Sequence, residues 1–373
     1  MTAAPSLWSL QPHTGAKHEI LKRYLEAWIP IFGYSGTSPR LFYIDGFAGP
    51  GKYSDGEDGS PIVALRSALS HATKLKSRID FHFVEADSAR ASHLDDYIGN
   101  IRLPSQVSVK VHAGVPFTAA YERIKVEYSL STRSAPPTFA FIDPFGWTGA
   151  PFSIVKELMS APKSEVLVNL MYESINRHLS HPDQLKNFTA LFGTDEWKST
   201  LNLSDKTQRG SALHRLYQTQ LERSAGIKFV RSFEMRDDGN RIEYFMFFGS
   251  NEELGLRKMK EAMWRVDQSG QFSFSDATDQ DQLVLFDKAD FRPLHDAIVN
   301  AFAGATVSIE EIESFVIRCT AFRETHFKAV LKDLEITAPP SIEVIVPENG
   351  SLAKLRRRGT FPAGRGLLIR FCS

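Results

Sequence analysis

The sequence predicts an α/β protein in which a mostly parallel sheet ends in a hairpin, followed by a smaller domain of three helices and a β-ribbon. Three observations lead to this prediction. Up to about residue 170, short apolar runs alternate with helical patterns, which is typical of a parallel sheet with helices on both faces. The turn sequence Asp237-Asp-Gly-Asn240 then joins two strand-like runs. Beyond an aspartate-rich stretch, the chain shows short helical patterns.

The larger domain, residues 1–268, is expected to begin with a helix over 14–31, because the apolar residues there fall on one helical face. Ser60 and Pro61 are expected to start a second helix as its N-cap and first residue. A polar helical insertion is expected over about 176–210, and a further helix over 211–224. The predicted strands are 41–45, 79–85, 107–111, 138–143 and 165–170, followed by the hairpin strands 228–235 and 241–248.

The smaller domain is predicted to be a winged helix-turn-helix over residues 291–373, joined by an acidic linker, 269–290. Ser308 and Glu311 have the spacing of a capping box that opens its second helix. The other expected elements are helices 291–303 and 323–334 and strands 342–346 and 367–370.

The end of the chain is basic. After residue 350 there are six Lys or Arg and no acid, and the third predicted helix adds four basic residues. Such a surface can contact nucleic-acid phosphates, but winged helices also bind proteins, so both kinds of partner stay open. The basic side chains are Arg323, His326, Lys328, Lys332, Lys354, Arg356, Arg357, Arg358, Arg365 and Arg370.

Composition excludes several classes of protein. The 373 residues contain equal numbers of basic and acidic side chains, 44 each, so any nucleic-acid surface must be local. Cys319 and Cys372 are too few for a disulfide framework or a cysteine-rich metal site, and their apolar neighbours predict buried thiols. No signal peptide or membrane-spanning run is present, which predicts a cytoplasmic protein without a membrane partner.

A glycine-rich loop, Asp45-Gly-Phe-Ala-Gly-Pro-Gly51, follows the first strand. In open α/β sheets, ligands bind outside the carboxyl ends of the strands, where glycines allow close approach. The spacing is neither that of a dinucleotide loop nor that of a phosphate-binding loop. An acid here repels a pyrophosphate but suits the sulfonium and amino groups of S-adenosylmethionine. We therefore expect cofactor contacts from the loop, at Asp45, Gly46, Phe47, Ala48, Gly49 and Gly51; an ordinary turn is the alternative.

Other candidate cofactor residues come from three further places. Glu85 ends the second strand, where an acid can accept hydrogen bonds from ribose hydroxyls, although it could instead be an exposed acid. His112 and Ala113 end the third strand and could meet an adenine or simply pack. Lys17, with His13, could fold over the pocket from the first helix, or be solvated.

The fourth strand ends in Asp143-Pro-Phe-Gly146. Methylation of an exocyclic amine needs acceptors for the two amine hydrogens and a ring that holds the base flat. Asp143, the carbonyl of Pro144 and the ring of Phe145 can supply them, and catalysis is then largely positioning. The usual pattern has a second proline after the acid, where this chain has Phe145, and a strand-ending turn is the alternative.

With these residues assembled, the chain resembles the three-Cys-motif partner (TcmP) family, a Rossmann-like methyltransferase domain with a C-terminal winged helix. The family is named for a radical-SAM-like partner protein with a three-cysteine motif. The first loop is also similar to that of ribosomal-RNA adenine-N6 methyltransferases, which implies cofactor contact at Asp45, Ala48, Gly49, Gly51 and Glu85. The stretches that carry the resemblance are 13–17, 43–53, 59–61, 83–85, 143–146 and 174–177.

The sequence thus predicts an S-adenosylmethionine-dependent methyltransferase that acts on an amino group of a nucleic-acid base. The alternative is a non-catalytic protein that binds the cofactor or a nucleoside. Its winged helix would then recruit nucleic acid or the three-Cys-motif partner.

Overall fold

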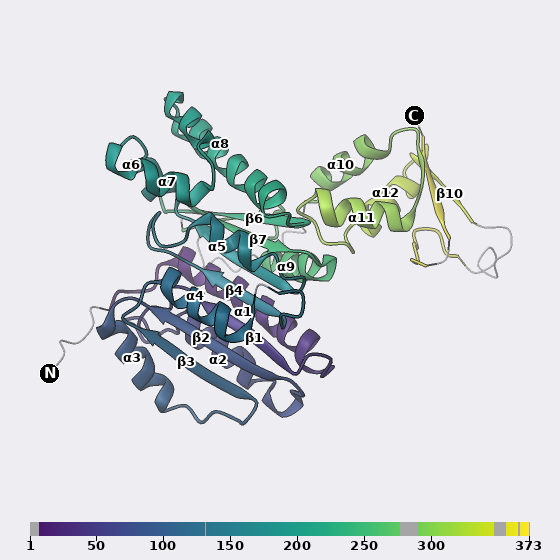
Figure 1. The fold of residues 1–373 in the computed structure, drawn as a ribbon. Helices are drawn as coiled ribbons and strands as arrows, with labels where there is room; N and C mark the ends of the chain where they lie inside the picture. Colours follow the sequence, from purple (N-terminus) through teal and green to yellow (C-terminus); the bar gives the residue numbers. More distant parts are fainter. Residues whose placement is uncertain (1–6, 131, 277–289, 347–355, 365, 373) are drawn as a thin grey trace. The chain divides into compact units, whose positions relative to one another are not determined.

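The computed structural model describes residues 7–130, 132–276, 290–346, 356–364 and 366–372 (Figure 1). The chain divides into two compact units. The larger takes residues 1–266 and 273–279, and the smaller takes residues 267–272 and 280–373.

The larger unit is built on an eight-stranded sheet of order β3-β2-β1-β4-β5-β7-β6-β8. Strands β1 to β5 run parallel to one another, whereas β7 is antiparallel to both of its neighbours, β5 and β6. The predicted Rossmann-like sheet with its terminal hairpin is confirmed. The strands are β1 (Arg40–Asp45), β2 (Arg78–Glu85), β3 (Val107–Ala113), β4 (Thr138–Ile142), β5 (Ser164–Leu170), β6 (Phe229–Arg236), β7 (Ile242–Ser250) and β8 (Ser273–Ser275).

Helices cover both faces of this sheet, as expected from the buried apolar runs of its strands. On one face, α1 packs beside α2 and α9, and Tyr24 and Trp28 of α1 contact Phe139 of β4. On the other face, Phe42 and Ile44 join one apolar core with α4 to α8. The helices are α1 (Pro12–Gly33), α2 (Ser60–Leu69), α3 (Ser88–Gly99), α4 (Phe117–Tyr128), α5 (Phe152–Leu158), α6 (Tyr172–His178), α7 (Leu185–Phe192), α8 (Lys206–Thr219) and α9 (Glu253–Val266), with 3-10 turns η1 (Ala72–Lys74), η2 (Pro182–Gln184) and η3 (Glu196–Asn202) and a π turn η4 (Gln220–Ser224).

Several sequence predictions need correction. The 176–210 insertion is helical but not a polar appendage, since its Phe188 and Trp197 are fully buried in the core. Ser60 is not an N-cap, because the cap of α2 is Gly59 and the Ser60 hydroxyl donates to Asp45 instead. Residues 273–275, predicted as linker, form β8 beside β6. The two cysteines, predicted buried, are exposed.

In its described residues, the smaller unit contains three helices and a three-stranded antiparallel sheet of order β10-β11-β9. The Ser308–Glu311 capping box is confirmed. The third helix begins at Phe327 rather than at 323, because the Arg323 amide donates to His326 Nδ1 in a turn before it. Strand β9 was not predicted. The elements are α10 (Arg292–Phe302), β9 (Thr306–Ser308), α11 (Ile309–Cys319), α12 (Phe327–Ile336), β10 (Ile342–Ile345) and β11 (Leu368–Phe371).

Part of the basic tail is used within the smaller unit. Arg356 donates to both carboxylate oxygens of Glu335 at 2.7 and 2.8 Å, and Arg358 donates to the main-chain oxygen of Glu335. Arg370 pairs with Glu343. The exposed basic side chains of this unit include Lys328, Lys332 and Arg357, while Lys354 and Arg365 lie outside the described residues.

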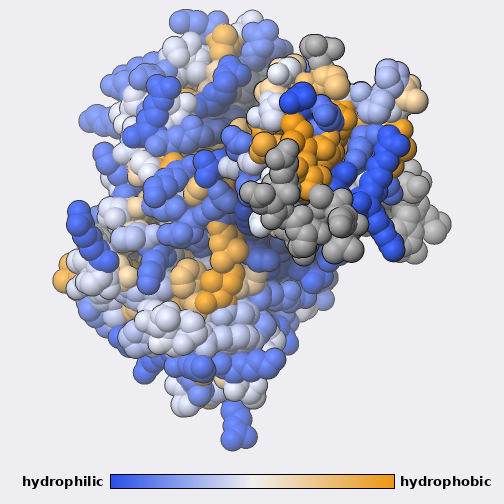
Figure 2. Space-filling model, turned by 90° about the vertical axis from the view of Figure 1, so that its right-hand side faces the viewer, coloured by the Kyte–Doolittle hydropathy of each residue, from blue (hydrophilic) through white to orange (hydrophobic). Residues whose placement is uncertain are grey.

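The surface is mostly hydrophilic on the face that Figure 2 turns toward the viewer, with apolar side chains confined to small patches. Among the helices of the described residues, none has the length and apolar composition that a membrane span requires.

Candidate functional site

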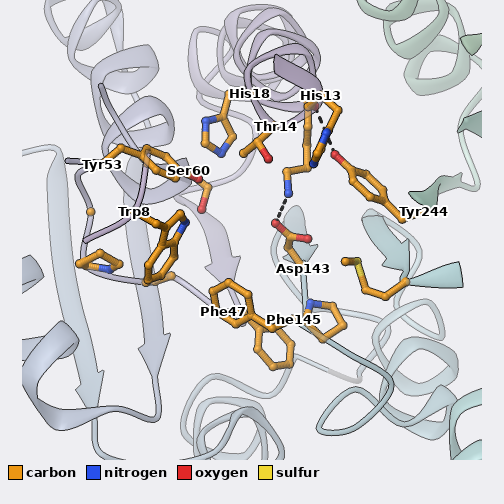
Figure 3. Close-up of a pocket in the computed structure, with 18 of the residues that line it drawn as sticks. Trp8, His13, Thr14, His18, Phe47, Tyr53, Ser60, Asp143, Phe145 and Tyr244 are labelled. Carbon is orange, nitrogen blue, oxygen red and sulfur yellow. Dashed lines mark hydrogen bonds and ion pairs between the residues drawn. The ribbon is translucent and has the colours of Figure 1, made fainter. Parts of the chain in front are cut away.

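A cavity lies at the carboxyl edge of the sheet, where the loops after β1 and β4 meet (Figure 3). Strands β1 and β4 are neighbours from which the chain winds outward in opposite directions, so this is the topological switch point of the sheet. The space there measures about 820 Å³, a figure that includes solvent at its open side. The lining comprises Trp8, His13, Thr14, Lys17, His18, Phe47 to Tyr53, Gly59, Ser60, Asp143, Pro144, Phe145, Met171, Glu243 and Tyr244.

The glycine-rich loop is held from below by Asp45, which is fully buried and does not line the cavity. Its carboxylate accepts from the Phe47 amide at 3.1 Å and from the Ser60 hydroxyl at 2.6 Å. Burial raises the pKa of Asp45 to about 7, because it disfavours the charged carboxylate more than these hydrogen bonds favour it. Asp45 therefore shapes the loop rather than reaching into the cavity.

Two glycines of the loop take backbone conformations that other residues rarely adopt. Gly49 has φ +65°, and a Cβ built there would meet no atom within 4 Å. Gly51 has φ +83°, and its Cβ would lie 2.7 Å from Cδ1 of Leu94. A side chain at Gly51 would thus displace the end of Leu94, whereas one at Gly49 would enter open space beside the cavity.

Glu85 also braces the loop. Its carboxylate accepts from the amides of Gly49 at 2.9 Å and Asp87 at 2.8 Å, and it pairs with Arg90 at 3.0 Å. Glu85 lies at the end of β2, as predicted, and is only 4% exposed. It does not line the cavity. Asp87 caps α3 by accepting from the amides of Ala89 and Arg90.

The structure does not bring the remaining strand-end candidates to the cavity. His112 Nε2 lies 3.0 Å from His82 Nδ1, the two rings stack, and burial lowers the pKa of both residues. Ala113 ends β3 away from the lining. Gly46 packs against Phe117, whose ring would lie 2.9 Å from a Cβ at that position.

Asp143 lies in the cavity, and both of its carboxylate oxygens have partners. Oδ2 pairs with Nζ of Lys17, and Oδ1 accepts from Nδ2 of buried Asn169 at 2.5 Å. The Lys17 ammonium also lies 5.2 Å from the ring centroid of Tyr244. Lys17 and Asp143, which are 126 positions apart in the sequence, thus meet inside the site (Figure 3).

Aromatic side chains form the mouth of the cavity. Phe145 is 61% exposed, and its ring lies edge-to-face with Trp8 at 5.6 Å. The Arg90 guanidinium lies over both rings, at 5.6 and 6.0 Å. Tyr53 adds a third ring beside Trp8. Such a mouth can hold a planar group.

Sequence reasoning missed several lining residues. Trp8 and Tyr53 are isolated aromatic residues without a local pattern, and Tyr244 belongs to a strand, β7, in which Tyr244 to Ser250 are all buried, so the strand pattern does not single it out. His18 lies in the lining, where burial and the neighbouring Lys17 lower its pKa to about 3, so its ring is neutral. In the sequence, the position of His18 next to Lys17 does not distinguish a residue of the cavity from a residue of the core.

No family model and no curated protein matches this chain. Among solved structures, a candidate O-methyltransferase from Klebsiella pneumoniae is 12% identical, with 62% of this chain and 80% of that chain covered and a TM-score of 0.33. A candidate caffeoyl-CoA O-methyltransferase from Staphylococcus aureus is 10% identical, with 61% and 82% covered and a TM-score of 0.30. A geranyl diphosphate methyltransferase, solved with GPP and sinefungin, is 10% identical, with 64% and 78% covered and a TM-score of 0.28. A resemblance at these scores identifies neither the family nor the substrate of this chain.

Proposed function

We propose that the larger unit is an S-adenosylmethionine-dependent methyltransferase. One observation carries the proposal: a glycine-rich loop that lacks a phosphate-binding pattern and the acid Asp143 face one cavity at the switch point of the sheet. The switch point is where open α/β sheets bind their ligands, so this cavity is the place for a cofactor and an acceptor to meet.

The charged side chains that line the cavity fit S-adenosylmethionine better than a dinucleotide. Both lysines of the lining are paired with carboxylates, Lys17 with Asp143 and Lys52 with Asp58, so neither is available to neutralise a pyrophosphate. Because Asp143 is paired with Lys17, Glu243 is the carboxylate of the lining that makes it favourable to positive charge. The open space at Gly49 allows a ligand to approach the loop backbone. When bound, the cofactor supplies a methyl group activated by a sulfonium.

For the acceptor, we propose an amino group of a nucleic-acid base. Asp143 and the carbonyl of Pro144 would accept the amine hydrogens, and the exposed ring of Phe145 would hold the base flat. An incoming amine would take the place of Lys17 on Oδ2, while Asn169 keeps the carboxylate oriented through Oδ1. Phe145 stands where a second proline is usual, and its ring lies at the cavity mouth.

The engagement of Asp143 by Lys17 and Asn169 also favours a second candidate, a protein that binds the cofactor or a nucleoside without catalysis. The two differ in one outcome. A methyltransferase produces labelled nucleic acid, whereas a binding protein retains the cofactor unchanged.

The smaller unit, in this proposal, is a winged helix that recruits nucleic acid or the three-Cys-motif partner in the cytoplasm. Its order of elements, helix, strand, two helices and two strands, supports a winged helix. Lys328 and Lys332 of α12 and Arg357 are exposed and could reach phosphates. Lys328→Glu combined with Lys332→Glu should then weaken nucleic-acid retention, measured by gel shift at fixed salt.

The direct test is transfer of radiolabel from methyl-labelled S-adenosylmethionine to total RNA and to total DNA. Asp143→Ala should abolish transfer while the calorimetric affinity for S-adenosylhomocysteine stays within a few-fold of wild type. Asp183→Ala, an exposed acid outside the cavity, is the control and should leave both unchanged. Transfer by Asp143→Ala at the wild-type rate would reject the role of Asp143. Cofactor binding without label in either pool would favour the binding protein.

A further inference from the structure

A contact between a carboxylate and an imidazole lies at the roof of the cavity. Nδ1 of His13 and Oδ2 of Asp276 are 2.7 Å apart, and the two side chains are only 16% and 10% exposed. His13 lines the cavity one helical turn before Lys17, and Figure 3 shows it beside Tyr244. Asp276 directly follows β8, so the last strand of the sheet brings this carboxylate to α1.

We propose that His13 is the residue that accepts the proton of the group to be methylated, and that Asp276 is the positioning residue that orients its imidazole. The inference rests on the proposed methyl transfer. It adds a requirement on the substrate class, which is an acceptor that must lose a proton during the reaction.

Hydrogen-bond chemistry determines which nitrogen of His13 is available. A carboxylate only accepts hydrogen bonds, so contact with Asp276 places the proton of a neutral His13 on Nδ1. Nε2 then carries the lone pair. Within the ranges that the structure describes, Nε2 of His13 has no hydrogen-bond partner, and the ring forms part of the cavity wall. Nε2 is therefore a base open to a ligand.

Neighbouring groups hold the ring in this orientation. The Tyr244 hydroxyl donates to the main-chain oxygen of His13 at 3.2 Å, and the two rings lie edge-to-face at 5.6 Å. The charged groups around the ring come from three elements: Lys17 on α1, Glu243 on β7 and Asp276 after β8. The imidazole is thus fixed from both its backbone and its side chain.

Asp143 is poorly suited to the same task. Its two oxygens accept from Lys17 and Asn169, so it is equipped to orient an amine rather than to take a proton. Asp143 and Asp276 therefore have different roles. Asp143 acts on the acceptor directly, and Asp276 acts through His13.

The reaction balances with these groups alone. A bond forms between the acceptor nitrogen and the methyl carbon while the bond from that carbon to the sulfonium sulfur breaks, and the bonding pair stays on sulfur. The acceptor nitrogen is left with an excess proton, which passes to Nε2 of His13. The positive charge moves from the sulfonium to the imidazolium, which the carboxylate of Asp276 compensates. No other reactant is needed.

The test combines a structural and a kinetic readout on the full chain. Nitrogen-15 NMR of histidine-labelled protein, with His13→Gln for assignment, should show the Nδ1-protonated tautomer of His13 in wild type and a mixture of tautomers in Asp276→Asn. In single-turnover transfer from labelled S-adenosylmethionine to the nucleic-acid pool that wild type methylates, His13→Gln should lower the rate about 100- to 10,000-fold. Asp276→Asn should lower it less, and both should bind S-adenosylhomocysteine as wild type does. His181→Gln, an exposed histidine outside the lining, is the control.

Each contrary result overturns a distinct claim. An Nε2-protonated His13 in wild type, or turnover of His13→Gln within a few-fold of wild type, would reject the proton-acceptor role while leaving methyl transfer established. If wild type labels neither RNA nor DNA, the proposed function fails, and the role of His13 fails with it.

Discussion

Burial of Asp45 predicts that the larger unit loses stability as pH rises. The pKa of this carboxyl is about 7 in the folded chain against 3.8 ordinarily, so the folded state binds more protons than the unfolded state between these values. Stability from the protonated form is complete below about pH 4 and is lost as pH rises through about 7. Asp45→Asn keeps the shape of the side chain and an acceptor for the Phe47 amide, while its amide nitrogen can donate to Ser60 but cannot ionise.

The size of this loss of stability follows from the difference between the two pKa values of Asp45. About three pKa units at 1.36 kcal/mol each set an upper limit of about 4 kcal/mol, of which about 2.5 kcal/mol falls between pH 5 and pH 8. The free energy of unfolding of wild type, relative to Asp45→Asn, should therefore fall by about 2.5 kcal/mol over that interval. Glu165, whose pKa burial also raises to about 7, contributes equally to both proteins and cancels in the difference.

Urea unfolding followed by tryptophan fluorescence measures this difference. The signal reports the larger unit alone, because that unit contains all five tryptophans, Trp8, Trp28, Trp147, Trp197 and Trp264. Asp183→Asn, which changes an exposed acid, should show no such trend. A difference between wild type and Asp45→Asn that is flat from pH 5 to pH 8 would mean that Asp45 ionises normally in the folded chain, and would refute the reasoning.

Three further substitutions test the packing around the site. Left-handed backbone strain should cost Gly51→Ala and Gly49→Ala about 1–2 kcal/mol each. Gly51→Ala should lose more than this, because its Cβ also overlaps Leu94. Equal losses for the two variants in urea unfolding would contradict this. Phe188→Ala should cost about 3–5 kcal/mol, since the insertion is part of the core, and a loss near zero would show it to be a surface appendage. Asp87→Ala should cost about 1 kcal/mol through loss of the α3 cap, with Asp87→Asn restoring most of it by the same assay.

The sequence predicts the carboxyl edge of the sheet well because the signal there is local. Strands β1 and β2 end in Asp45 and Glu85, β4 is followed directly by Asp143, and the parallel arrangement places those ends together. Asp45, Glu85 and Asp143 were located in this way. The local sequence does not determine where these side chains point, however. The Glu85 carboxylate, for example, contacts the amide of Gly49 and the side chain of Arg90.

The rest of the site depends on contacts between distant segments. Trp8 and Tyr244 reach the cavity, and Asp276 reaches His13, only after α1, the hairpin and β8 have packed, and no spacing in the sequence indicates those contacts. The insertion looked polar because its few apolar residues, such as Phe188 and Trp197, are separated by polar ones on a short helix and a 3-10 turn. Strand β8, three residues long, is too short for a pattern to show.

The central claim is that the cavity binds S-adenosylmethionine, and the most direct measurement is calorimetric titration with S-adenosylhomocysteine of wild type, Gly49→Ala and Gly56→Ala. Both glycines have positive φ and open space for a Cβ, but only Gly49 lines the cavity. The predicted result is saturable binding by wild type and Gly56→Ala and markedly weaker binding by Gly49→Ala. No binding by wild type, or equal binding by all three proteins, would contradict the assignment of the cofactor to this cavity.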